Sequence, residues 1–345
     1  MTRRAPAQLS LFDDRAAAAP GAGGARPAPD DDVAPLIAAE DVDRAARLPS
    51  WVRFGTSSWT FPGWGGLVYA GAPSREALLR GGLRAYARQP LLRTVGIDRS
   101  YYAPLTGAEL EQYAAQLPAG FLAVSKAWDA VTTAVFPRHP RYGPLAGAPN
   151  PRFLDPVYFT ERVLSAYEGA FAPFTGPFVV EIPPIPAGSA FDASAFPRRL
   201  DSFLAGLPRR FRYAVELRNR ELFTRRYLHA LRRQGAAHVL NFWSFMPPLG
   251  QQLAVLPADV TPFWVVRLLL PPGTQYEAQR ERFAPFRELR DVQLAMRRDV
   301  VSITRAAAVR GGADLFVLVN NKAEGSSPLT VRALAELVAD ALAAG

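Results

Sequence analysis

The chain has 345 residues, of which 49% are hydrophobic and 21% charged, a balance typical of a globular protein rather than a disordered or fibrous one. It contains no cysteine, which excludes disulfides, thiolate metal sites and cysteine nucleophiles. The formal net charge is +9; residues 1–50 are net acidic, so the basic excess lies in residues 51–345, where it favours either phosphate-bearing partners such as DNA or a merely solvated basic surface.

Residues 1–50 are rich in Ala, Pro, Gly and Asp and show no sustained hydrophobic period. We therefore expect a flexible tail over residues 1–50, with at most a weak helix within 33–46, followed by one folded domain over residues 51–345. Arg3 and Arg4 are not followed by the apolar stretch of a secretory signal, and no later apolar run approaches membrane-spanning length. These features predict a cytoplasmic protein with no membrane partner.

One apolar pentapeptide interrupts the tail. Its residues are Gln8, Leu9, Ser10, Leu11 and Phe12, and they resemble the bacterial motif Q-L-[S/D]-L-F, in which Gln, Leu and Phe insert into pockets of the DNA sliding clamp. The alternative is a chance match, expected on the order of once in a thousand chains of this length. The position on a flexible tether favours a clamp-binding function, because such an anchor reaches a partner while the folded domain stays free.

From Trp51 onward, short apolar runs alternate with longer segments of helical period. The predicted helices cover residues 75–88, 108–116, 160–169, 193–206 and 222–234, a stretch within 278–310, and 330–343. The predicted strands cover residues 52–57, 93–98, 121–126, 177–182, 212–217, 237–242, 263–270 and 315–320. Eight strands alternating with helices predict a (β/α)8 TIM barrel, with a doubly wound open sheet as the alternative.

The predicted strands end in polar residues. In a barrel all the carboxyl ends lie on one face, which carries the active site in enzymes of this fold. Two long connections, 128–159 and 271–284, leave the strands on that same face. The residues expected to bind a substrate there are Trp59, Asp98, Tyr102, Arg218, Asn219, Asn241, Arg267, Asn320, Asn321 and Lys322.

The candidate catalytic residues are Glu216, Lys126 and Glu181. Glu181 and Glu216 belong to neighbouring strands, so one of them is a candidate for a protonated acid and the other for a base. The alternative is that Arg218 and Arg267 neutralise both carboxylates as structural ion pairs. Lys126 stands out because 38 of the 40 basic residues are Arg, and lysine suits proton transfer or imine chemistry better than arginine.

Metal binding has weak support in the sequence. His139, His229 and His238 are the three histidines, and none lies at the carboxyl end of a predicted strand, so a zinc cluster is not expected. The sequence leaves open the hypothesis that the carboxylates of Asp98, Glu181 or Glu216 bind a divalent cation. The cofactor is otherwise undetermined.

Several segments resemble one known family. They are Gly55 to Trp64 with the following Val68-Tyr69, then Phe121 to Lys126, Val180 to Pro184, Ala214 to Asn219, and Val319 to Asn321. Together they are similar to the motifs of the YecE-like family, domain of unknown function 72, over roughly residues 52–340. The resemblance implies a TIM barrel of no established activity, with Trp59, Lys126, Glu216, Arg218, Arg267, Asn320 and Asn321 at the barrel mouth.

The chain also departs from that family's pattern. Gly96 and Asp98 stand where Glu and Asn are usual in that family, and Glu181 stands where Gln is usual. The His that usually follows the arginine of the seventh strand, here Arg267, is absent. Three functions stay open: a clamp-tethered barrel that processes phosphodiesters or abasic sites in DNA as a hydrolase or lyase, a non-catalytic DNA-associated adaptor, and a sugar-phosphate enzyme with no role on DNA.

Overall fold

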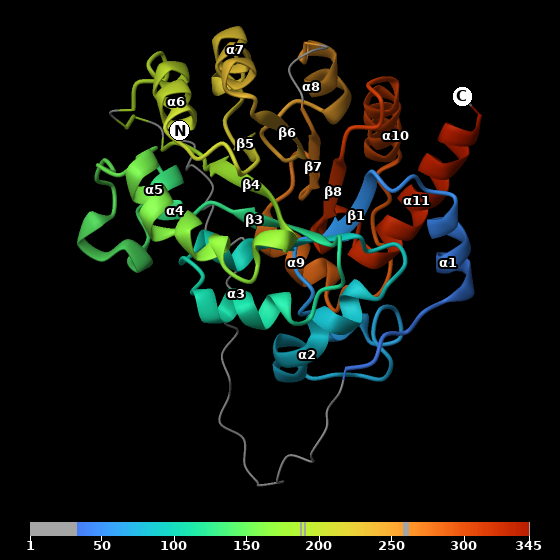
Figure 1. Cartoon of the computed structure of the whole chain (residues 1–345). Helices are drawn as coiled ribbons and strands as arrows, with labels where there is room; N and C mark the ends of the chain where they lie inside the picture. The colour runs from blue at the N-terminus through green and yellow to red at the C-terminus, as the bar shows by residue number, and fades with distance from the viewer. Residues whose placement is uncertain (1–32, 187, 190, 258–261, 345) are drawn as a thin grey trace, which may run out of the picture.

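The structure, a computed structural model, describes residues 33–186, 188–189, 191–257 and 262–344. Eight parallel strands form a closed barrel in sequence order, in which β8 pairs with β1 (Figure 1). This confirms the predicted (β/α)8 barrel and rules out the open sheet. The strands are β1 (Val52–Thr56), β2 (Thr94–Ile97), β3 (Leu122–Lys126), β4 (Thr175–Ile182), β5 (Tyr213–Leu217), β6 (Ala237–Phe242), β7 (Trp264–Leu268) and β8 (Leu315–Val319).

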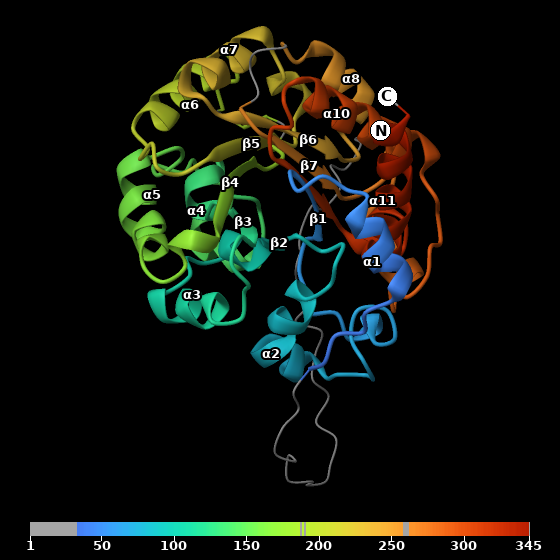
Figure 2. The ribbon, with the colours of Figure 1, turned by 45° about the vertical axis from the view of Figure 1, so that its right-hand side comes forward.

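The helices surround the barrel (Figures 1 and 2). None of the described helices is long and apolar enough to cross a membrane. The helices are α1 (Ala39–Ala46), α2 (Arg75–Ala87), α3 (Gly107–Ala114), α4 (Asp129–Thr132), α5 (Pro156–Arg162), α6 (Phe196–Ala205), α7 (Arg225–Gln234), α8 (Leu249–Val255), α9 (Tyr276–Phe283), α10 (Leu294–Val309) and α11 (Ser327–Ala343).

Helix α8 was not predicted. It has only two turns, and one of its two buried side chains is the polar Gln252, which interrupts the apolar stripe that marks an amphipathic helix. Gln252 Nε2 donates to the carbonyl of Asn241, and its Oε1 accepts from the Asn241 N–H. The amide thus replaces an apolar contact with hydrogen bonds to β6.

Strand parity decides which side chains fill the barrel. A separate apolar cluster in the lumen contains Val124, Val179, Ala214, Val239 and Val265. Because side chains two residues apart share a face of a strand, the lumen also receives the next polar position toward the carboxyl end of each of these strands. Those positions are Lys126, Glu181, Glu216, Asn241 and Arg267, and they form the uppermost layer of the barrel interior.

The predicted tail boundary at residue 50 is wrong, because residues 33–50 belong to the folded unit. Val33, Ala45 and Leu48 are buried in the main core. Helix α1 lies on α11, where Arg44 Nε contacts Glu336 at 2.9 Å and Arg332 Nη2 contacts Asp41 at 2.8 Å. The segment is short and polar, so only its contacts with the barrel make it fold. The pentapeptide Gln8 to Phe12 lies outside the described residues.

His238 faces outward from β6 and holds two helices against the barrel. Its Nδ1 is 2.8 Å from the Tyr227 hydroxyl of α7, and its Nε2 is 3.3 Å from Gln252 Oε1 of α8. The ring also stacks on Phe223 at 4.7 Å between centroids. Complete burial lowers the pKa of His238 from 6.5 to about 4, so the folded protein keeps this imidazole neutral.

We predict that this histidine makes folding sensitive to mild acid. His238 binds a proton near pH 6.5 in the unfolded chain and only near pH 4 in the folded chain. Its contribution to the free energy of unfolding is therefore fully present above pH 6.5 and is lost as the pH falls toward 4. The loss amounts to roughly 3 kcal/mol. Urea unfolding at several pH values measures it. His238→Gln flattens this dependence, whereas His229→Gln, at an exposed position, leaves it in place; an unchanged slope in His238→Gln contradicts the assignment.

Candidate functional site

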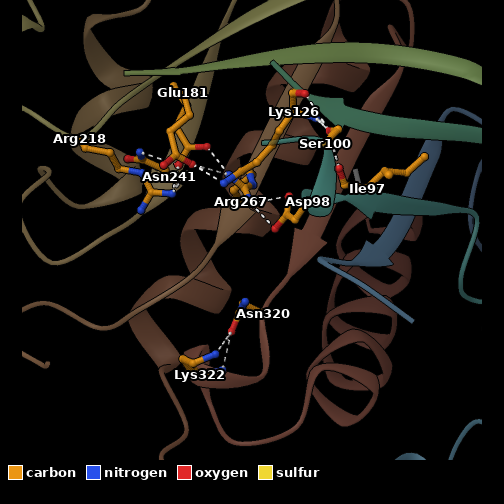
Figure 3. A network of polar contacts seen from close by, with 11 residues as sticks. Ile97, Asp98, Ser100, Lys126, Glu181, Arg218, Asn241, Arg267, Asn320 and Lys322 are labelled. Carbon is orange, nitrogen blue, oxygen red and sulfur yellow. Dashed lines mark hydrogen bonds and ion pairs between the residues drawn. The ribbon is translucent and has the colours of Figure 1, made fainter. Parts of the chain in front are cut away.

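The centre of the candidate site is the guanidinium of Arg267 on β7. It binds carboxylates from three other strands (Figure 3). Its Nη2 lies 2.9 Å from Asp98 Oδ2, directly after β2, and its Nη1 lies 3.2 Å from Glu181 Oε2 on β4 and also contacts Glu216 Oε2 on β5. One arginine therefore joins four strands across the top of the barrel.

Two further cations complete the network. Arg218 follows β5 and places Nη2 2.9 Å from Glu181 Oε2 and 2.8 Å from Glu216 Oε1. Lys126 ends β3 and places Nζ 2.6 Å from Glu181 Oε2. A single oxygen of Glu181 thus receives three cationic groups. We call Asp98, Lys126, Glu181, Glu216, Arg218 and Arg267 the mouth cluster.

The mouth cluster is buried, and its charges balance. Each of its six residues is at most 4% exposed. Three of the side chains are cations and three are carboxylates. Removing such groups from water costs several kcal/mol per ion, which only close pairing offsets. The cations hold the pKa of Glu181 well below its usual value despite its burial. Burial raises the pKa of Asp98, partly offset by Arg267 and Lys126.

These contacts bear on the two alternatives for the glutamates. Glu181 and Glu216 are register partners on adjacent strands, as their neighbouring positions suggested. Arg218 and Arg267 each contact both carboxylates, which is the ion-pair arrangement. Glu181 is therefore held as a carboxylate in the free protein. The carboxyl whose pKa is raised is instead Asp98, which lies on the opposite side of Arg267.

Aromatic rings lie over the cations of the mouth cluster. The ring of Tyr101 is centred 4.6 Å from Lys126 Nζ, and that of Trp243 is 4.1 Å from Arg218 Cζ. Tyr102 packs edge-on against Tyr101, and its ring is 5.0 Å from Arg141 Cζ. Such rings favour the charged form of a buried cation. They also make the entrance suitable for stacking on a planar or sugar-like group.

Hydrogen-bonding atoms of the site lack a protein partner. Arg218 Nε and Nη1 and Asn241 Oδ1 are buried and make no hydrogen bond within the described part of the chain. The amide of Asn241 is oriented by its Nδ2, which donates to the Leu217 carbonyl at 2.7 Å and to Glu216 Oε1 at 3.3 Å. Unsatisfied buried donors and acceptors are costly, so Arg218 and Asn241 provide two donors and one acceptor suited to a bound group.

Asn320 and Lys322 lie beside β8, on the wall opposite β4 and β5 (Figure 3). Asn320 Oδ1 accepts from the Lys322 N–H at 3.0 Å and from Lys322 Nζ at 3.5 Å. Lys322 Nζ is also 4.2 Å from the centre of the Tyr276 ring, from α9. The second lysine of the chain is therefore buried under an aromatic side chain, like the first.

Three predicted site residues have structural contacts instead of a place in the mouth cluster. Trp59 is buried between α2 and α3; its Nε1 donates to the Leu78 carbonyl. Asn219 ties two loops together by donating to the Pro183 carbonyl and accepting from the Ile185 N–H. Asn321 Oδ1 accepts from Trp64 Nε1 and from the N–H and hydroxyl of Ser327, at the start of α11.

Three residues at the mouth are absent from the predicted site residues. Ser100 accepts from the Lys126 N–H and donates to the Lys126 and Ile97 carbonyls, so it fixes the end of β3 beside β2. Tyr101 and Trp243 cover the two cations described above. All three follow the carboxyl end of a strand, which was the available signal, but only the folded loops reveal which way their side chains point.

The three carboxylates of the mouth cluster do not form a metal site. No group of three or more His, Cys, Asp or Glu side chains among the described residues is arranged to hold an ion. Their oxygens point toward Arg267, Arg218 and Lys126 instead. The cation binding left open at Asp98, Glu181 or Glu216 therefore requires these pairs to separate.

The fold and this site define a (β/α)8 barrel with a buried, charge-balanced cluster at the carboxyl ends of its strands. The chain belongs to the family described as "Protein of unknown function DUF72", whose model matches residues 53–344. This confirms the family resemblance seen in the sequence. No curated protein matches the chain.

Solved structures of the same family share the fold. The chain is similar to a DUF72 family protein from Enterococcus faecalis V583, with a TM-score of 0.56 and 13% identity, over 84% of this chain and 95% of that one. It is also similar to a DUF72 family protein from Thermotoga maritima MSB8, with a TM-score of 0.55 and 17% identity, over 84% of this chain and 99% of that one. At these identities the comparison establishes the barrel alone.

We predict that Arg267→Met destabilises the protein by about 3–5 kcal/mol, because it leaves buried carboxylates without their shared partner. Chemical denaturation measures the loss. Arg298→Met, at an exposed position of α10, changes the stability by less than about 0.5 kcal/mol. A loss below about 1 kcal/mol in Arg267→Met means that Arg218 and Lys126 suffice to hold the three carboxylates.

Proposed function

We propose that this protein is an enzyme of DNA metabolism that acts on a nucleotide or abasic sugar displaced from the strand, with the mouth cluster as its reactive centre. The observation that carries the proposal is the mouth cluster itself. Ionisable side chains from β2 to β5 and β7 converge at the face where barrel enzymes work. Perturbed pKa values within such a cluster are typical of functional sites.

The depth of the cluster defines what reaches it. The residues of the mouth cluster are at most 4% exposed, so a base or sugar inside a duplex cannot reach them. A DNA substrate therefore has to extrude the nucleotide that reacts. Tyr101, which covers Lys126, and its neighbour Tyr102 are half-buried at the mouth and suit stacking on an extruded group. The Nε and Nη1 atoms of Arg218, which have no hydrogen-bond partner among the described residues, suit a phosphate or hydroxyl oxygen.

The pair Lys126 and Glu181 supplies a route for a proton. In the free protein Glu181 is a carboxylate, stabilised first by Arg218. A phosphate oxygen bound to Arg218 competes with Glu181 for the positive charge of the guanidinium, and this raises the pKa of Glu181. Glu181 can then accept the proton of Lys126 Nζ, which lies 2.6 Å from its Oε2. The neutral amine then attacks the aldehyde carbon of an open abasic sugar, and Glu181 returns its proton to the resulting hydroxyl, which leaves as water and gives a protonated imine. The Glu181 carboxylate next removes the proton from the carbon adjacent to the imine, and the bond between the following carbon and the phosphate oxygen breaks, so that the phosphate leaves.

The proposal also includes a tether. Gln8, Leu9, Leu11 and Phe12 resemble the sliding-clamp motif and precede Val33, the first described residue, which is buried in the main core. A chain of roughly 20 residues spans tens of ångströms even when it is coiled, so a clamp-bound tail leaves the barrel free to sample nearby DNA. A non-catalytic, clamp-associated adaptor shares this tether but needs no turnover at Lys126.

A second candidate is an enzyme for a free sugar phosphate. It is favoured by the charge of the loops at the mouth, where acidic and basic residues are nearly equal in number. A long polyanion gains little from such a surface, whereas a single phosphate needs only the donors of Arg218. The two candidates share the chemistry of the cluster and differ in the size of the substrate.

We predict that sodium borohydride traps an adduct between this protein and an oligonucleotide that carries one abasic site. Only two lysines, Lys126 and Lys322, are present, so peptide mapping distinguishes an adduct at Lys126 from one at Lys322 or at the N-terminal amine. Lys126→Arg keeps the charge next to Glu181 and lowers adduct formation and strand cleavage by about 100-fold or more. No adduct, or one elsewhere than Lys126, overturns the lyase reaction.

We predict that the intact protein is retained by an immobilised sliding clamp and that a Gln8→Ala, Leu11→Ala, Phe12→Ala variant is not. The triple substitution removes the side chains that fill the clamp pockets and leaves the barrel unchanged. Equal unfolding temperatures of the two proteins provide the control. Failure of the intact protein to bind the clamp removes the tether while leaving the chemistry at Lys126 open to its own test.

A further inference from the structure

The outer surface of α7 is uniformly basic. Its exposed side chains are Arg225, Arg226, His229, Arg232 and Arg233, which we call the α7 basic face. The spacing of these residues places them on one side of the helix. The opposite side buries Tyr227, Leu228, Ala230 and Leu231 against the barrel. The helix carries no acidic residue, so nothing within it neutralises the row.

This arrangement works against the stability of the helix. Arg225 and Arg226 begin α7, where the helix dipole disfavours cations, and the first turn contains no acidic side chain. Neither of these two arginines makes a hydrogen bond or ion pair with another described residue. Four arginines on one exposed face also repel each other. The fold therefore gains nothing evident from Arg225 and Arg226, and a ligand outside the fold accounts for them better.

The basic surface continues beyond the helix. Arg209, in the loop before β5, donates to the carbonyl of Gln234 at 3.0 Å and to its side chain at 2.9 Å, so it lies at the end of α7. Asp201 on α6 lies 3.3 Å from Arg233. An exposed pair of this kind is weak and screened by salt, so it leaves the surface strongly positive.

The chemistry of the surface identifies the partner. The exposed large apolar side chains of the described residues lie on other elements, and none is on α6 or α7. A protein interface needs such anchors at its centre, and a helix that inserts into a membrane surface needs them on one face. Arginines without apolar anchors fit phosphate groups. The nine residues from Arg225 to Arg233 span about 12 Å, along which duplex DNA presents about seven charges.

We propose that the α7 basic face binds the phosphate backbone of duplex DNA. This surface lies on the outside of the barrel and is separate from the mouth cluster, although α7 starts on the mouth side, directly after Arg218 and the short turn Arg220–Leu222. Binding there supplies the attraction to DNA that the balanced loops of the mouth lack. It goes beyond the proposed reaction, because it requires no chemistry at Lys126.

The test compares two variants with the same change of charge. In the first, Arg225, Arg226, Arg232 and Arg233 are replaced by Gln. In the control, Arg75, Arg80, Arg84 and Arg88 are replaced by Gln; these residues lie on or next to α2, which is on the far side of the barrel from α7 (Figures 1 and 2). Binding to a labelled 20-base-pair duplex is measured by fluorescence anisotropy between 50 and 200 mM salt.

We expect the α7 variant to bind at least 10-fold more weakly than the intact protein, with a slope of log affinity against log salt that is smaller by roughly three to four. The α2 variant stays within about threefold. Equal loss in both variants means that net charge alone attracts DNA, and that result overturns the proposal. So does an intact protein that fails to bind at 50 mM salt, or one that prefers phosphatidylserine vesicles to the duplex.

Two further measurements keep the outcomes separate. The unfolding temperature of the α7 variant stays equal or rises, because Gln is a good helix former and the substitution removes cations from the first turn; a weaker affinity therefore does not reflect unfolding. Lys126→Arg retains duplex binding, and the α7 variant still forms the borohydride adduct with a short single-stranded abasic oligonucleotide. Failure of the reaction and failure of the DNA surface are thus distinguishable.

Discussion

The contact on which the top of the barrel depends is that of Arg267 with three carboxylates from three other strands. Arginine suits this position because its planar fork presents several donors in fixed directions and stays charged when buried. The carboxylates raise the pKa of Arg267 further despite its burial. Without this shared cation, Asp98, Glu181 and Glu216 would repel one another inside a closed barrel.

The balance of charges in the mouth cluster also constrains its chemistry. Every carboxylate is ion-paired, so a proton moves only when a bound group disturbs a pair. Arg218 is the residue best placed to respond to a bound group. Two of its donor nitrogens have no partner in the described chain, while the third contacts both Glu181 and Glu216. In the proposed reaction, substrate binding and proton transfer are thereby coupled through one side chain.

The division between mouth and outer surface follows from the fold. Strands carry their polar residues to one end of the barrel, where loops and aromatic rings exclude water from Lys126 and Arg218. The helices face solvent, so a row of arginines is accommodated there without the close charge pairing that the mouth requires, as on α7. A barrel of this kind can hold a large substrate on its outside while reacting with a small part of it at the mouth.

The amino-acid sequence by itself determined the eight strands, the family and the polar strand ends that meet at the mouth, because apolar period and motif spacing are local properties of the chain. It also identified every member of the mouth cluster. Tertiary structure alone decided that Glu181 is ion-paired, that Trp59, Asn219 and Asn321 make structural contacts outside the mouth cluster, and that α8 exists around the buried Gln252. Those outcomes depend on which side chains meet across strands and loops, and that information is absent from any single segment.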